Sequence, residues 1–274
     1  MGSSSNDIQG GSMPEITSIH NPKIQSLREL MNKRSAREEL GQFVVEGVRL
    51  AEEALMHGAL PLAVYAGESL SERGQKLVGE FQSRGTTVTT LSDDVLQRIS
   101  ETENSQGILL TMPVTLKALP EDLNFVLILD QIRDPGNAGT MLRTAAASGV
   151  QAVLLAPGTT DSYAPKVVRA GMGAHFRLNL LSCTWPEIHR LCKVRERPLK
   201  LLLAESGDAP SVWQQDLRPP LGLTIGGEAE GAGEEARHYC DGLVSIPMPG
   251  GFESLNAAVA AGILLFEVVR QRAL

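Results

Sequence analysis

Residues 125–157 read FVLILDQIRDPGNAGTMLRTAAASGVQAVLLAP. The first five residues form an unbroken apolar run that ends at Asp130, which is typical of a strand buried on both faces of a parallel sheet. A Pro-Gly turn follows, and we expect a helix from Asn137 or Ala138 to about Gly149, and then a second strand over 150–157. A strand, a helix and another strand in this order predict an α/β fold with a mostly parallel sheet that helices cover on both faces.

The same alternation continues on both sides of this stretch. After it, we expect helices over 164–174 and 185–195, strands over 199–206 and 221–227, and a long final helix. Before it, we expect a smaller α/β domain whose first helix begins at Asn21-Pro22, because asparagine caps a helix and proline suits its first turn. The further elements expected there are strands over 43–47, 61–67, 86–92 and 106–112, and helices over 48–58, 72–83 and after Ser92 or Asp93.

Composition shifts divide the chain into four parts. Residues 1–12 are small, polar and without periodicity, and we interpret them as a disordered expression leader. Residues 13–112 form the small α/β domain and residues 113–122, with two prolines and little periodicity, form the linker. Residues 123–274 form the parallel-sheet domain. The longest apolar run is far shorter than the roughly 20 residues that a membrane span needs, so no membrane helix is expected.

The charge and the cysteines limit the function classes. A formal net charge of −7 over 274 residues argues against nonspecific coating of nucleic acid, although Lys33, Arg34 and Arg37 are a candidate local basic surface. The three cysteines are an odd, sparse set that favours reduced thiols and a cytoplasmic protein. A zinc site at Cys183, His189 and Cys192 lacks a fourth ligand at a usual spacing, so no metal site is predicted.

Three glycine-containing loops follow strands of the second domain. The first, 131–137, leads into the helix that carries Arg143. The second, 226–233, holds four glycines around two acidic residues, and the third, 247–256, is rich in proline and glycine. Ligands of open α/β sheets bind beyond the carboxyl ends of the strands, so these loops are the expected site. A dinucleotide site is disfavoured, because GNAG is not G-x-G-x-x-G and the following strand ends in LLAPG, without a ribose-binding acid.

The third loop leads directly into the apolar final helix, in the stretch PMPGGFESLNAAVAAGILLFE at residues 247–267. Glu253 and Ser254 resemble a helix start. The side chains of Ser254 and Asn256 either cap this helix or face a pocket. The helix is apolar on nearly every side, which predicts burial all round, and Gly262 would permit a close backbone approach.

The three loops together resemble a known family. In order and spacing, NAGTMLRTAAASG, GGEAEGAG and IPMPGGFESLNAAVAAGILLFEVVRQR resemble the three motifs of the TrmH/SpoU group of SPOUT RNA methyltransferases. Residues 21–50, NPKIQSLRELMNKRSAREELGQFVVEGVRL, resemble the ribosomal-protein-like substrate-binding domain that precedes the catalytic domain in many members. In one departure from the family pattern, Ala229 stands after Glu228, where the second motif commonly has glycine.

This resemblance implies a trefoil-knotted catalytic domain, an obligate homodimer and S-adenosylmethionine as the cofactor. The reaction implied is methyl transfer to a ribose 2'-hydroxyl of structured RNA, with ribosomal RNA as the expected substrate. By position, the implied cofactor-binding residues are Gly226, Ile246 and Leu255, with Ala204, Gly227 and Met248 nearby.

The implied catalytic set centres on Arg143. A guanidinium pKa above about 12 makes a general-base role awkward, so we expect Arg143 to orient the ribose and phosphate and to assist proton removal. Asn137, Glu228, Ser254 and Asn256 complete the set. Three alternatives stay open: a noncatalytic RNA-binding or ribosome-assembly factor, a transfer RNA 2'-O-methyltransferase, and a resistance methylase acting on one ribosomal nucleotide.

Overall fold

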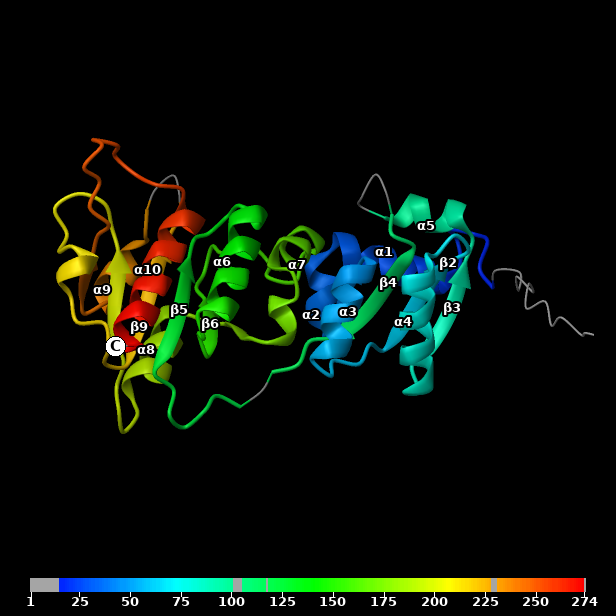
Figure 1. The fold of residues 1–274 in the computed structure, drawn as a ribbon, viewed down its shortest axis with the longest axis horizontal. Helices are drawn as coiled ribbons and strands as arrows, with labels where there is room; N and C mark the ends of the chain where they lie inside the picture. The colour runs from blue at the N-terminus through cyan, green and yellow to red at the C-terminus, as the bar shows by residue number, and fades with distance from the viewer. Residues whose placement is uncertain (1–14, 101–104, 117, 228–230, 274) are drawn as a thin grey trace, which may run out of the picture. The chain divides into compact units, whose positions relative to one another are not determined.

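The computed structural model describes residues 15–100, 105–116, 118–227 and 231–273. The chain divides into two compact units, and the division falls after Pro113 (Figure 1). Each unit has its own sheet and its own helices. Within the described ranges, no helix has the length and apolar character needed to cross a membrane.

The N-terminal unit is built on a four-stranded mixed sheet in the order β1-β4-β2-β3. β4 runs antiparallel to β1 and β2, and β2 runs parallel to β3. The strands are β1 (Gln42–Glu46), β2 (Ala63–Gly67), β3 (Thr87–Leu91) and β4 (Ile108–Pro113). The helices are α1 (Pro22–Asn32), α2 (Arg34–Leu40), α3 (Val48–Met56), α4 (Glu72–Ser83) and α5 (Asp93–Ile99).

Side-chain caps fix the starts of three of these helices. Asn21 accepts a hydrogen bond from the backbone of Lys23 at the start of α1, as the sequence predicts. Ser71 and Ser92 cap α4 and α5 in the same way. The predicted limits of α4 are confirmed because its cap and its apolar spacing agree.

The prediction that Lys33, Arg34 and Arg37 form one basic surface is wrong for Arg37. Arg37 is buried, and its guanidinium donates to the backbone carbonyls of Leu30 and Met31 at the end of α1, with the Met31 bond at 3.1 Å. Lys33 pairs with Glu29 at 2.9 Å and Arg34 pairs with Glu38 at 2.7 Å. Arg37 therefore joins α1 to α2, whereas Lys33 and Arg34 stay exposed beside acidic partners four residues away in sequence.

The C-terminal unit is built on a six-stranded parallel sheet in the order β10-β8-β9-β5-β6-β7. The strands are β5 (Phe125–Asp130), β6 (Ala152–Leu155), β7 (Asn179–Ser182), β8 (Lys200–Ala204), β9 (Leu221–Gly226) and β10 (Gly242–Val244). The helices are α6 (Pro135–Ala147), α7 (Pro165–Gly171), α8 (Trp185–Lys193), α9 (Glu234–Tyr239) and α10 (Ala257–Arg272), with short 3-10 turns at Ala174–Phe176 and Val212–Gln214. The prediction of a parallel α/β domain preceded by a smaller α/β domain is confirmed. The implied trefoil knot concerns the path of the chain and stays a prediction.

Alternation along β5 creates the layers of this unit. Phe125, Leu127 and Leu129 pack into a core with α6 and α10, whereas Val126 and Ile128 pack into a second core with α8 and α9. Because β5 lies in the middle of the sheet, both of its faces are buried, and its sequence is apolar at every position but the last.

Several boundaries differ from the sequence prediction. α6 begins at Pro135 because Asp134 caps it, accepting from the backbone of Asn137 at 2.7 Å. α10 begins at Ala257 and not at Glu253 or Ser254, because Asn256 provides its cap. The sequence analysis missed α2, β7 and β10, since each is short and has no clear periodicity.

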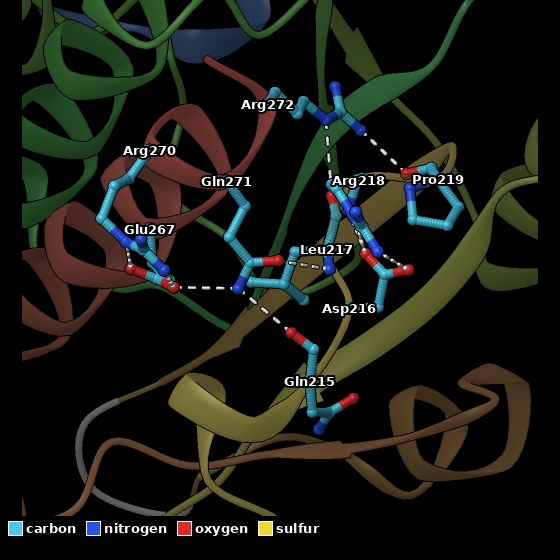
Figure 2. A network of polar contacts seen from close by, with 9 residues as sticks. All are labelled: Gln215, Asp216, Leu217, Arg218, Pro219, Glu267, Arg270, Gln271 and Arg272. Atoms are coloured by element: carbon cyan, nitrogen blue, oxygen red, sulfur yellow. Dashed lines mark hydrogen bonds and ion pairs between the residues drawn. The ribbon is translucent and has the colours of Figure 1, made fainter. Parts of the chain in front are cut away.

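The end of α10 is held by a polar network (Figure 2). Glu267 is buried and accepts from Arg270 and from Gln271, both at 2.8 Å. The Gln271 side chain also accepts from the backbone of Leu217 and donates to the carbonyl of Gln215. This network ties α10 to the chain between β8 and β9, and so fixes the helix whose first turn borders the candidate site.

His175 is a buried base at the contact between α6, α7 and the 3-10 turn that follows α7. Its Nε2 lies 2.7 Å from the carbonyl oxygen of Ser162, and burial lowers its pKa to about 4. As the pH falls below 6.5, His175 becomes protonated in the unfolded chain, but in the folded chain it stays neutral until about pH 4. The stability that neutral His175 contributes is therefore present above pH 6.5 and is lost as the pH falls toward 4.

We expect the free energy of unfolding to fall by about 2 kcal/mol between pH 7 and pH 5 through His175 alone. Both tryptophans lie in the C-terminal unit, so urea unfolding followed by tryptophan fluorescence reports on that unit. The His175→Gln variant should lose this part of the pH dependence, while a variant of the exposed His20, His20→Gln, should keep it. Equal pH dependence in wild type and His175→Gln would contradict the assignment.

Candidate functional site

The three predicted loops meet at one edge of the six-stranded sheet. β5 ends at Asp130, opposite Gly226 at the end of β9, and β8 ends at Ala204, opposite Ile225 of β9. In Figure 1, the loop that precedes α10, drawn in orange, extends from the same edge, where α10 begins. Parallel strands bring their carboxyl ends together, so the topology gathers loops that are about a hundred residues apart in sequence.

A cavity of about 540 Å³ opens at this edge. Eight predicted site residues line it. They are Ala204, Gly226, Gly227, Ile246, Met248, Ser254, Leu255 and Asn256. The whole predicted cofactor set is thus brought into one cavity, and the roles of these residues stay predictions.

Glycines of the second loop make close backbone packing possible. A Cβ atom on Gly226 would lie 2.5 Å from the backbone nitrogen of Ala232, and one on Gly227 would lie 2.5 Å from the carbonyl oxygen of Gln131. Gly231 has a φ of +70°, which favours glycine. The loop therefore presents main-chain atoms to the cavity. The predicted residue Glu228 and the neighbouring Ala229 lie outside the described residues.

Asp130 anchors the glycine loop through a hydrogen bond to its last residue, Gly233. Its carboxylate is buried and accepts from the backbone of Gly233 at 2.7 Å and from Nε1 of Trp185 at 3.0 Å. The next residue, Gln131, has a φ of +57°, unusual for a residue with a side chain, and packs against Gly227. From the sequence, Asp130 marks only the end of a strand. A single acid directly after five apolar residues was the sequence signal for a buried role.

We expect Asp130→Asn to lower the free energy of unfolding by about 2 kcal/mol, because an amide accepts one of the two hydrogen bonds and turns an N–H toward the other donor. Urea unfolding followed by tryptophan fluorescence measures this. Asp208→Asn, at an exposed aspartate of the same unit, is the control and should leave the midpoint unchanged. An unchanged midpoint for Asp130→Asn would show that the buried contacts contribute nothing.

Asn256 both caps α10 and borders the cavity, so the two alternatives left open by the sequence hold together. Its Oδ1 accepts from the backbone of Ala258 at 3.0 Å and Val259 at 3.2 Å. Its Nδ2 donates to Oδ1 of Asn137 at 3.1 Å. This bond joins the first turns of α6 and α10, and it places Asn137 beside the cavity.

Arg143 stands apart from the other predicted residues. It lies two turns along α6 from its start and is exposed, and it is not among the residues that line the cavity. The face of α6 that carries Thr144 instead meets α10 at Gly262, whose missing side chain leaves room there. Within one chain, the predicted cofactor residues therefore line the cavity and the predicted arginine does not.

The sequence analysis missed one charged residue of the cavity, Glu205. It follows β8 directly and forms an ion pair with Arg237 of α9. The position of Glu205 at the end of the predicted strand over 199–206 was the sequence signal for a residue at this edge of the sheet.

Comparison with known proteins agrees with this architecture. Residues 124–266 match the SpoU rRNA Methylase family, and residues 21–110 match the MRM3-like substrate binding domain. The chain is 33% identical to the 23S rRNA (guanosine-2'-O-)-methyltransferase RlmB of Shewanella oneidensis over 84% of this chain and 98% of the relative. It is 32% identical to the 23S rRNA (uridine(2479)-2'-O)-methyltransferase of Streptomyces viridochromogenes over 94% and 92%.

Solved structures give the same result. The AdoMet-bound rRNA methyltransferase from Sinorhizobium meliloti matches with a TM-score of 0.81 at 28% identity, over 93% of this chain and 97% of that one. The SpoU methyltransferase AviRb from Streptomyces viridochromogenes, in complex with the cofactor AdoMet, matches with a TM-score of 0.79 at 29% identity, over 92% and 98%. The chain therefore belongs to the SpoU rRNA methylase family.

Proposed function

We propose that this protein transfers a methyl group from S-adenosylmethionine to a ribose 2'-hydroxyl of ribosomal RNA. The observation that carries this proposal is the cavity at the carboxyl edge of the sheet, which gathers the whole predicted cofactor set. Relatives along nearly the full chain are ribosomal RNA 2'-O-methyltransferases, one acting on guanosine and one on uridine. They support the ribose as the target and leave the base open.

The residues present fit the cofactor. Gly226 and Gly227 leave no space for a Cβ, so the loop keeps its main-chain groups against the cavity, and Ile246, Met248 and Leu255 supply apolar surface. When bound, the cofactor supplies an electrophilic methyl group on a sulfonium. The main-chain groups of Gly226, Ile246 and Leu255 would hold it.

The polar residues act on the RNA. Arg143 is exposed and positively charged, which suits it to bind a phosphate and orient the ribose beside it. The amides of Asn137 and Asn256 fix each other at the cavity edge, with Ser254 beside them. The 2'-hydroxyl must lose its proton as the methyl group arrives. A guanidinium stays protonated and does not accept this proton, so Arg143 orients the ribose and the neighbouring substrate phosphate, and the phosphate accepts the proton as the O–CH3 bond forms.

A homodimer through the C-terminal domain belongs to this proposal. The apolar side chains of Val259 and Phe266 on α10 are 52% and 49% exposed, so one chain leaves apolar surface on this helix uncovered. A second copy covering this face would bring the two sets of site residues together, and would supply Arg143 to a cavity that lacks it within one chain. Sedimentation velocity should give a dimer mass, and a monomer at micromolar concentration would contradict this part.

The N-terminal unit is proposed to bind the substrate. Its match to a substrate binding domain over residues 21–110 supports this role, and we propose residues 113–122 as the linker to the catalytic domain at 123–274. Ribosomal RNA as substrate, and three cysteines without a disulfide, support a cytoplasmic location.

The proposal is tested by binding and transfer with the purified protein. Calorimetry should detect S-adenosylmethionine binding, and a labelled methyl group should pass to ribosomal RNA from cells that lack the gene. Transfer to transfer RNA alone would contradict the substrate. Absence of cofactor binding would favour a noncatalytic RNA-binding factor with the same fold.

A further inference from the structure

Glu205 has a fixed place at the cavity. It is the first residue after β8, and its backbone N–H donates to the carbonyl of Val244 in β10 at 2.9 Å. β8 lies next to β9, whose end begins the glycine loop. The backbone of Glu205 is therefore fixed at the end of β8, next to the strand that leads into the glycine loop.

Glu205 is also the one acidic or basic side chain among the described residues that line the cavity. The rest of that lining consists of apolar side chains, glycines, two serines and Asn256. The Glu205 side chain is 27% exposed, and its only ion pair among the described residues is with Arg237, which is 46% exposed. Arg237 is held on α9, where its guanidinium lies beside Gly231 at the end of the glycine loop.

Carboxylates at this place in a parallel sheet have a known use. In dinucleotide-binding sheets, a glycine-rich loop after one strand approaches the cofactor, and an acid at the end of a neighbouring strand accepts hydrogen bonds from ribose hydroxyls. The strand over 150–157 ends in LLAPG, without such an acid. The structure places one at the end of β8, on the other side of the glycine-loop strand β9.

We propose that Glu205 recognises the adenosine ribose of the cofactor by accepting hydrogen bonds from its 2'- and 3'-hydroxyls. This inference rests on the proposed function and adds a binding residue to it. Arg237 is a positioning residue that holds the carboxylate toward the cavity. The glycine loop contributes main-chain contacts, and Glu205 contributes the selection for a ribose over a deoxyribose.

Isothermal titration calorimetry on the full chain tests this with three ligands. S-adenosylhomocysteine and 5'-methylthioadenosine both carry the ribose diol, and the second lacks the amino acid group. The third is the 2',3'-dideoxy form of 5'-methylthioadenosine. We expect Glu205→Gln to weaken binding of the first two by about tenfold, the cost of a charge-assisted hydrogen bond. The dideoxy ligand should bind wild type about tenfold more weakly than its parent, and Glu205→Gln should weaken it little further.

Asp216→Asn is the matched control, because Asp216 also pairs with an arginine, Arg218, but does not line the cavity. Its ligand affinities should equal those of wild type, and the melting temperatures of both variants check folding. If Glu205→Gln binds every ligand as wild type does, the inference is wrong and the proposed function stands. A loss confined to S-adenosylhomocysteine would assign Glu205 to the ammonium group and overturn the ribose contact. If wild type binds none of the ligands, the proposed function itself is contradicted.

Discussion

Arg143→Ala should lower the rate of methyl transfer by about a hundredfold to a thousandfold while leaving cofactor affinity unchanged. Arg143 orients the ribose and phosphate, and loss of one group that positions or stabilises the reacting atoms typically costs about this factor. Arg143 is exposed on α6 and does not line the cavity, so the cofactor site and the fold should survive the change. Single-turnover transfer to ribosomal RNA measures the rate, and calorimetry measures the affinity.

Two further variants make this result specific. Arg190→Ala removes an exposed arginine from α8, on the opposite face of the sheet, and should keep the wild-type rate. Arg143→Lys keeps the charge but loses the planar fork, so it should be slower than wild type and faster than the alanine variant. A wild-type rate in Arg143→Ala would remove Arg143 from the site.

Gly227→Val should weaken cofactor binding by about tenfold to a hundredfold. Even the first added carbon would lie 2.5 Å from the carbonyl oxygen of Gln131, and that oxygen belongs to backbone that cannot move aside like a side chain. The loop must shift, and overpacking of this kind costs about 1–3 kcal/mol or more. Calorimetry with S-adenosylmethionine measures the loss, and the melting temperature shows how much of the fold remains.

Gly250→Ala is the matched control in the loop before α10. No atom lies within 4 Å of a Cβ built on Gly250, and its φ is not in the left-handed region, so the substitution should leave affinity unchanged. Wild-type affinity in Gly227→Val would show that the close packing of the glycine loop has no part in cofactor binding.

The sheet and most of its helices follow from local signals. β5 is an unbroken apolar run, α4 has a serine cap and regular apolar spacing, and α1 begins at Asn21-Pro22. Glycines and prolines after strand ends mark the loops, and parallel strands bring such loops together at one cavity. The choice of the cofactor residues on these loops is what the resemblance implies. The predicted roles came from the resemblance and not from these patterns.

The features that could not be predicted from the sequence depend on contacts between residues that are far apart in it. Asp130 contacts Trp185 and Gly233, and Glu205 pairs with Arg237, but no local pattern links these positions. Arg37 resembles a surface charge until α1 and α2 bury it against backbone carbonyls. The bond between Asn137 and Asn256 likewise spans 119 positions of sequence.

The final helix, α10, is less buried in the single chain than its apolar sequence predicts. Its apolar sequence predicts burial on every side, yet Val259 and Phe266 are about half exposed in the single chain. The polar network at its end fixes the last turn of this helix against the chain between β8 and β9 (Figure 2). The exposed apolar face at Val259 and Phe266 is the surface that the proposed homodimer would cover.

The central claim concerns the atom that receives the methyl group. Ribosomal RNA from cells that lack the gene should be incubated with the purified protein and methyl-labelled S-adenosylmethionine, then digested to nucleosides and separated. We predict label in a single 2'-O-methylated nucleoside, at one position that is unmodified in cells without the gene. Label on a nucleobase, or no label on any RNA despite cofactor binding, would contradict it.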